Sequence, residues 1–195
     1  MESRLSKDDW LKAARMALIE RGIGGVRVEV LARSLGVTKG SFYWHFPHRA
    51  ALMEGLLREW EDEADLLIGA LGGSGTEGLR TLVPQLAANV LASERGEVPS
   101  DAAIFAWAAI DPLIRERVDA AEEERVALLA TLIGGRQKAE LAYMAYLGFI
   151  LRRRHSPNPQ RAFALIGDLL LSLGGIQARP DEATSETNEL ATENG

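Results

Sequence analysis

Residues 27–46 constrain the fold of this chain most strongly, because they form the pattern of two short helices joined by a tight turn. In the first helix, apolar residues recur at i, i+3, i+4 and i+7, which is the spacing of one buried helix face, at Val28, Leu31, Ala32 and Leu35. Gly36 follows, and glycine readily adopts the positive φ with which helices commonly end. The segment therefore predicts a helix-turn-helix.

The second helix of this pair has one apolar face and one polar, aromatic face. Thr38 is a candidate N-cap, and Phe42 and Phe46 are four residues apart, as expected for a side that packs on a core. The other positions carry groups that can reach phosphates or bases: Lys39, Ser41, Tyr43, Trp44 and His45. An ordinary helical hairpin is the alternative, but aromatic rings facing water are uncommon there. We therefore favour a helix that enters the DNA major groove by its N-terminal residues.

From about residue 6 to residue 60 the chain resembles the N-terminal domain of the tetracycline-repressor (TetR) family of bacterial transcription regulators. The resemblance is carried by Leu31-Ala32, Gly36-Val37-Thr38-Lys39-Gly40-Ser41, Tyr43, His45-Phe46, Arg49 and Leu52. It implies an all-α fold: an N-terminal three-helix helix-turn-helix DNA-binding domain, followed by a C-terminal helical domain for ligand binding and dimerisation. Three positions depart from the family pattern: Arg27 and His48 replace common helix caps, and Arg49 replaces a common lysine.

The resemblance also implies roles for individual residues. Thr38, Tyr43 and His45 are expected to contact phosphates, and Lys39, Gly40 and Ser41 are expected to lie nearest the base edges. Phosphate contacts position a protein on DNA, whereas base contacts discriminate sequence. The expected DNA-binding set is Arg27, Thr38, Lys39, Gly40, Ser41, Tyr43, Trp44, His45 and Arg49.

Composition narrows the function classes. The chain has no cysteine, which excludes disulfides, zinc–thiolate sites and thiol nucleophiles. The sequence also lacks His-Glu-x-x-His, Gly-rich phosphate-loop and Gly-x-Ser-x-Gly motifs, so we expect no enzyme, no metal and no cofactor. The chain starts with a capped helix rather than an apolar signal region, and its apolar runs are too short to span a membrane, so we expect a cytoplasmic protein.

Charge is divided unevenly along the chain. Residues 1–60 carry a net charge of +3, whereas residues 61–195 carry −9. This asymmetry is typical of a basic DNA-binding domain on an acidic regulatory domain. We expect the DNA-binding domain at 1–50, a long linking helix at about 48–70, a helical effector-binding and dimerisation domain at 51–176, and a disordered acidic tail at 177–195.

Two helices near the C-terminus, at about 136–154 and 159–173, are unusually apolar on every side over residues 141–151 and 162–173. We interpret them as half of a four-helix dimer interface, with the core of a monomer as the alternative. The interface residues expected are Ala145, Gly148, Phe149, Phe163, Gly167 and Leu170. The arginine run at 152–154 is interpreted as complementing the negative end of its helix rather than as a second nucleic-acid patch.

By analogy with the family, a small molecule binds among the middle helices. The candidate lining residues are Gln85, Asn89, Phe105, Trp107, Tyr143, Met144 and Tyr146. Because few polar groups are expected there, the sequence predicts a largely apolar effector. The function expected is therefore a homodimeric repressor that leaves a palindromic operator when the effector binds. The alternatives are an effector-free DNA-binding dimer, and a ligand carrier or enzyme on the same scaffold.

Overall fold

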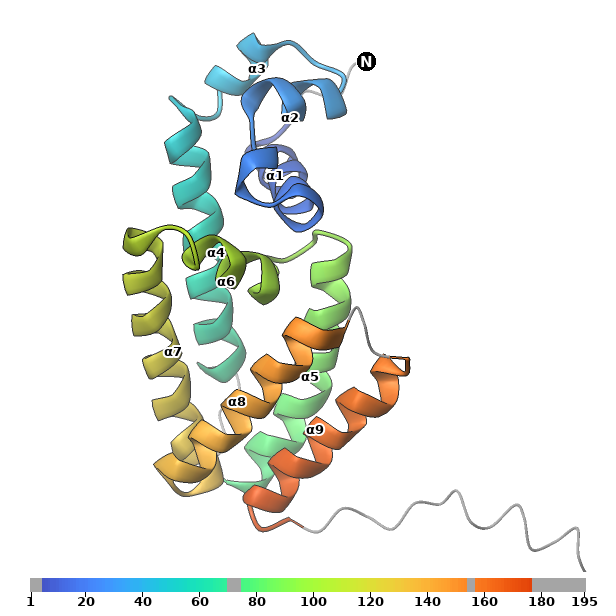
Figure 1. Ribbon diagram of the computed structural model, residues 1–195, viewed down its shortest axis with the longest axis vertical. Helices are drawn as coiled ribbons and strands as arrows, with labels where there is room; N and C mark the ends of the chain where they lie inside the picture. Colours follow the sequence, from blue (N-terminus) through green and yellow to red (C-terminus); the bar gives the residue numbers. More distant parts are fainter. Residues whose placement is uncertain (1–4, 70–74, 154–156, 177–195) are drawn as a thin grey trace, which may run out of the picture.

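The computed structural model describes residues 5–69, 75–153 and 157–176, which form helices and no strands, as the sequence predicts. At the top of Figure 1 lie α1 (Lys7–Arg21), α2 (Val28–Ser34) and α3 (Lys39–Tyr43). The long helix α4 (Arg49–Gly69) runs from this domain into a second bundle. That bundle contains α5 (Thr76–Glu94), α6 (Asp101–Ala108), α7 (Pro112–Ile133), α8 (Arg136–Arg152) and α9 (Pro159–Leu173). The expected C-terminal tail and Arg154 lie outside the described residues.

Local hydrogen bonds explain where the N-terminal helices begin and end. Ser6 and Asp9 form a capping box, in which the Ser6 backbone N–H donates to the Asp9 carboxylate at 2.7 Å. At the end of α2, Gly36 has a φ of 69°, and the next backbone N–H donates to the Ala32 carbonyl at 2.9 Å. This is a Schellman motif, so the predicted turn is confirmed.

His48 supplies the N-cap of α4 in place of the usual hydroxyl or carboxylate. Its Nδ1 accepts from the Ala51 backbone N–H at 3.1 Å. Arg27, in contrast, occupies the N-cap position of α2 without a side-chain capping bond. The missing family cap is therefore replaced at His48 but not at Arg27.

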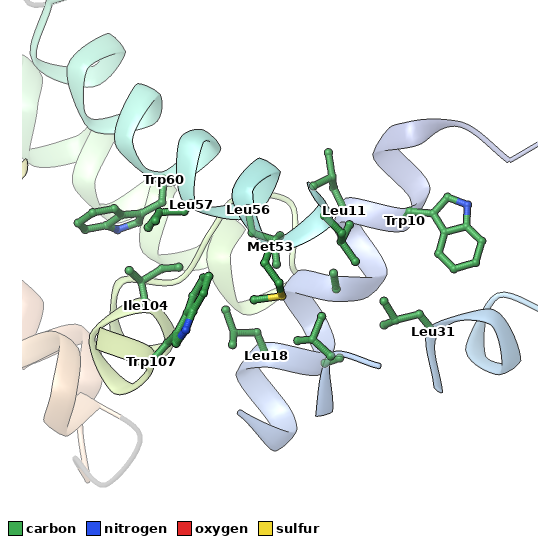
Figure 2. Packing of buried hydrophobic residues seen from close by; sticks show 14 of the residues in the cluster. Trp10, Leu11, Leu18, Leu31, Met53, Leu56, Leu57, Trp60, Ile104 and Trp107 are labelled. Atoms are coloured by element: carbon green, nitrogen blue, oxygen red, sulfur yellow. The ribbon is translucent and has the colours of Figure 1, made fainter. Parts of the chain in front are cut away.

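One buried cluster joins the N-terminal domain to the second bundle. Figure 2 shows it extending from Trp10 and Leu31 to Trp60 and Trp107, and α4 contributes Leu52, Leu56 and Leu57 along its length. The cluster therefore crosses the domain boundary expected near residue 50. A second cluster lies among α5, α7, α8 and α9, around Leu79, Val126, Ala139 and Leu170. No helix in the described part of the chain is long and apolar enough to cross a membrane.

The connection between α5 and α6 packs on α1 at a glycine. Gly96 has a φ of 66°, and a Cβ added there would lie 2.6 Å from Met16 Sδ. Its carbonyl accepts from the Arg15 side chain at 2.7 Å. A residue without a side chain is therefore needed at the point where the second bundle approaches α1.

We predict that Gly96→Ala costs more stability than Gly36→Ala, although the two glycines have nearly the same φ. At Gly36 nothing lies within 4 Å of an added Cβ, so only the backbone penalty of about 1–2 kcal/mol applies. At Gly96 the contact with Met16 adds about 1 kcal/mol or more. Urea denaturation measures both variants, and Met16→Ala in the Gly96→Ala background should recover part of the added loss. Equal losses at the two glycines would contradict the close packing on α1.

Candidate DNA-binding surface and interior cavity

Two phenylalanines fix the orientation of α3. Phe42 and Phe46 are 0% and 2% exposed, and their stacked rings have centroids 5.6 Å apart. Trp10 of α1 meets the Phe42 ring edge-on at 5.3 Å. Both phenylalanines were predicted to face the core, and this is confirmed. Because one side of α3 is anchored in this way, its opposite side faces solvent.

The solvent side of α3 carries most of the expected DNA-binding residues. Tyr43 and Trp44 are 60% and 80% exposed, and the other exposed members of the set are Arg27, Thr38, Lys39, Gly40 and Arg49. Ser41 and His45 are half-buried. Thr38 occupies the N-cap position as predicted, but its side chain makes no capping hydrogen bond. Its hydroxyl is therefore not committed to the helix.

Two of the basic residues are engaged within the free protein. Lys39 Nζ lies 2.7 Å from the Glu29 carboxylate on α2, and this hydrogen bond lowers the pKa of Glu29. The Arg49 guanidinium donates to the carbonyls of Val26 and Ile23, at 2.5 and 3.0 Å. Arg49 thus holds the start of α4 against the loop before α2, a role that the sequence did not predict.

A cavity opens among α4, α5, α6, α7 and α8, and its empty space, including the part open to solvent, is about 950 Å³. Most of its wall is apolar, with Leu82, Leu86, Leu129, Leu132 and Ile150 among the lining residues. Its wall, which is mostly apolar with a few polar groups, fits a small-molecule site. The loop before α6 contributes Val98, Pro99 and Ser100.

Three of the seven expected lining residues reach this cavity: Asn89, Tyr143 and Tyr146. The prediction is wrong for Met144, which is 58% exposed because it lies on the outer face of α8. It is also wrong for Phe105 and Trp107, which pack in the cluster that joins the two parts of the chain, with Phe105 edge-on to Trp60 at 6.0 Å. Gln85 is absent from the lining as well, and its buried Oε1 has no hydrogen-bond partner within the described structure.

Asp101 organises a polar cluster at one end of the cavity. Its carboxylate accepts from Trp60 Nε1 at 2.6 Å and from the Tyr146 hydroxyl at 2.8 Å. Arg125, which is 8% exposed, lies 3.6 Å from the same carboxylate and donates to the Trp60 carbonyl. The guanidinium also stacks over the Trp60 ring at 3.8 Å. Burial raises the pKa of the Tyr146 hydroxyl, so it stays a neutral donor to Asp101.

Further ionisable groups line the cavity, which contradicts the expectation of few polar groups. Burial raises the pKa of Glu63 to about 7. Arg153 is 5% exposed and donates to the Val90 carbonyl and to Ser93 Oγ, so it does not act as an exposed helix-end cation. Sequence periodicity contained a signal for both buried arginines. Arg125 is in register with Leu129 and Leu132, and Arg153 with Phe149 and Ile150, on apolar helix faces.

The expected dimer residues fall into two groups. Leu170 is 3% exposed within the single chain, and a Cβ on Gly167 would lie 2.9 Å from Val83 of α5. These two residues therefore pack inside the chain and are not available to a partner. Phe149 and Phe163 contact each other edge-on at 5.4 Å, and Ala145 is half-buried. Gly148 faces solvent, along with apolar neighbours on α8 and α9 at Leu141, Met144, Leu151 and Leu165.

Within the described residues, no group of three or more histidine, aspartate or glutamate side chains is placed to hold a metal ion.

Comparison with known proteins identifies the N-terminal domain. Residues 11–56 match the family model of bacterial regulatory proteins, tetR family. The HTH-type transcriptional regulator TtgR of Pseudomonas putida is 32% identical over 69 residues, which are 35% of this chain and 33% of that protein. The probable HTH-type transcriptional regulator ArpR, also of Pseudomonas putida, matches to the same extent. The chain thus spans about a third of the length of these curated relatives.

Solved structures extend the likeness in fold to most of the chain. A transcriptional regulator from Rhodococcus sp. Rha1 superposes with a TM-score of 0.66 at 23% identity, covering 90% of this chain and 100% of that one. AmtR from Mycobacterium smegmatis gives a TM-score of 0.66 at 21% identity, covering 92% and 90% of the two chains. At these identities the likeness concerns the fold alone. The match over residues 11–56, together with the geometry of α1 to α3, identifies the N-terminal domain as one of the tetR family of bacterial regulatory proteins.

Proposed function

We propose that this protein is a cytoplasmic transcriptional repressor that binds a palindromic operator as a homodimer and leaves it when a small molecule occupies the interior cavity. The observation that carries the proposal is the exposure of Lys39, Tyr43 and Trp44 on a short helix whose opposite face is anchored by Phe42 and Phe46. Such a helix can enter the major groove without disturbing the core.

The first test distinguishes the expected phosphate contact of Tyr43 from the expected base contact of Lys39. Tyr43→Ala should weaken binding to operator and scrambled duplexes alike, because a lost phosphate contact carries no sequence information. Lys39→Ala should also reduce the preference for operator, by about 1–3 kcal/mol if Lys39 reads a base edge. Fluorescence anisotropy titrations at two salt concentrations measure both effects, on an operator selected from random duplexes.

Lys12→Ala is the matched control for Lys39→Ala, since it removes a lysine from an exposed position on α1 that packs near Gly96 rather than at α3. It should leave the operator preference intact. Unchanged affinity in both α3 variants would contradict the assignment of this surface to DNA.

The second test addresses the dimer. We propose that the interface comprises the exposed apolar side chains of α8 and α9: Leu141, Met144, Leu151 and Leu165, with Gly148 among them. Two-fold symmetry there would place the two α3 helices in successive major grooves, roughly 34–36 Å apart. Gly148→Glu fits within a single chain, because nothing lies within 4 Å of the added Cβ.

Gly148→Glu should yield a folded monomer with strongly weakened operator binding, although α3 is untouched. Light scattering gives the mass, and Ala120→Glu, at an exposed position of α7, is the control that should remain dimeric. A dimeric Gly148→Glu variant would rule out this face as the interface.

The third test addresses the route from cavity to DNA. Arg15, 5% exposed, bonds the Gly96 carbonyl at 2.7 Å and the Glu59 carboxylate of α4 at 2.7 Å. Two residues after Gly96 the chain enters the cavity wall at Val98. We propose that a ligand displaces this loop and moves α1 through Arg15, in addition to any movement of α4.

Arg15→Lys keeps a charge but loses the planar fork that joins the two partners. In the wild type we expect a ligand to lower operator affinity by about 5- to 150-fold. In Arg15→Lys this ratio should shrink toward one while operator affinity without ligand changes little. An unchanged ratio would assign the coupling to α4 alone, and absence of any ligand effect in the wild type would favour an effector-free regulator.

A further inference from the structure

The cavity wall contains one carboxylate to which the described structure gives no partner. Glu63 is half-buried on α4, one turn beyond Trp60, and no hydrogen bond or ion pair within the described residues involves it. Burial raises its pKa to about 7. An ionised carboxylate in such a place is costly unless a cation or a hydrogen-bond donor reaches it.

The cations nearest to Glu63 are already paired with other carboxylates. Arg125 faces Asp101 and donates to the Trp60 carbonyl. Arg15 donates to Glu59 and to the Gly96 carbonyl. Asp101 and Glu59 in turn repel a negative charge on Glu63 and raise its pKa further. This end of the cavity therefore lacks one positive charge.

Arg153, the other buried arginine of the cavity wall, does not provide a matching site for an anion. Arg153 lies 3.5 Å from the Glu94 carboxylate and donates to Val90 and Ser93, although its Nε has no partner in the described structure. Its charge is thus balanced within the protein, whereas that of Glu63 is not.

The remaining wall suits an apolar body attached to a cation. Tyr143 and Tyr146 present aromatic rings, which attract positive charge. The buried Tyr143 hydroxyl has no partner in the described residues. Between these groups the surface is supplied by leucine, valine and isoleucine side chains of α5, α7 and α8.

We propose that the ligand of this cavity is an amphipathic organic cation, whose positively charged nitrogen pairs with the Glu63 carboxylate and whose apolar body fills the leucine-rich space. The inference rests on the proposed function only in treating this cavity as the effector site. It refines the largely apolar ligand expected from the sequence by adding a charged group at one end.

The probe is (naphthylmethyl)trimethylammonium, compared with its neutral isostere, in which a quaternary carbon replaces the nitrogen, and with naphthylmethanesulfonate. Isothermal titration calorimetry at pH 8, without DNA, gives the three affinities. The cation should bind about tenfold or more tightly than the neutral isostere, as an ionic contact with a half-buried carboxylate implies. The sulfonate should bind weakest.

Glu63→Gln keeps the shape of the side chain and removes its charge, so it should remove the preference for the cation over the isostere. Asp62→Asn is the matched control, since it removes the adjacent negative charge from an exposed position outside the cavity wall. It should leave the preference unchanged. Equal loss in both variants would overturn the pairing with Glu63.

The pH dependence gives an independent readout, because the probe keeps its charge at every pH. Below about pH 7 Glu63 holds a proton and above it is ionised. Affinity for the cation should therefore rise about five- to tenfold from pH 6 to pH 8, as the ionised fraction of Glu63 grows. The groups that face Glu63 are Asp101 of α6, Arg125 of α7, Arg15 of α1 and Glu59 of α4. Glu122 on α7 is another half-buried acid, and burial raises its pKa as well. If the pH dependence persists in Glu63→Gln, a group such as Glu122 is responsible for it and the proposal is overturned.

Failure of this inference is distinguishable from failure of the proposed function. If the neutral isostere or the sulfonate binds more tightly than the cation and releases the operator, the repressor function stands and the cation is wrong. If the cation binds with the expected dependence on Glu63 but leaves operator affinity unchanged, the ligand class stands and the effector role fails.

Discussion

The stacking of Arg125 on Trp60, with Asp101 beside both, is the interaction on which the arrangement of the second bundle depends. A guanidinium that is 8% exposed must be paired and hydrogen-bonded to remain in the core. Its partners come from α4 and α6, and the Tyr146 hydroxyl adds α8 to the same carboxylate. One buried charge thus fixes four helices relative to one another. If a different packing separated Arg125 from Asp101, at least one buried charge would be left without its partner. The cluster therefore permits few alternative packings.

The same cluster places the cavity next to the helix that connects the two parts of the chain. Trp60 lines the cavity and also ends the buried row that begins at Trp10 (Figure 2). A displacement of the Trp60 side chain would therefore disturb the buried cluster that also contains Phe42 of α3. Arg15 supplies a second connection, from the loop beside the cavity to α1. The fold thus offers two physical routes between the cavity and α3, one through apolar packing and one through a buried ion pair.

The sequence allowed us to predict features that depend on neighbouring residues, such as turns and the buried side of a helix. It did not allow us to predict contacts between segments that are distant in the sequence. The turn at Gly36 and the burial of Phe42 follow from spacing alone, and both are confirmed. Asp101 is separated from Trp60 by 41 positions in the sequence and from Tyr146 by 45. No local pattern therefore reveals that these three side chains meet. On helices that are apolar all round, periodicity does not show which side faces the chain itself. For that reason Met144 was assigned to the cavity and Leu170 to the dimer, whereas Met144 faces solvent and Leu170 packs inside.

The central claim is that ligand binding in the cavity and operator binding at α3 are coupled. The most direct test is whether each ligand lowers the affinity for the other by the same factor. The affinity of the naphthylmethyl cation is measured by calorimetry for the free protein and for the protein saturated with operator. We expect operator to weaken the cation by the same factor by which the cation weakens the operator, within about 5- to 150-fold. Equal affinity of the cation for free and operator-bound protein would contradict the coupling between Trp60, Arg15 and α3.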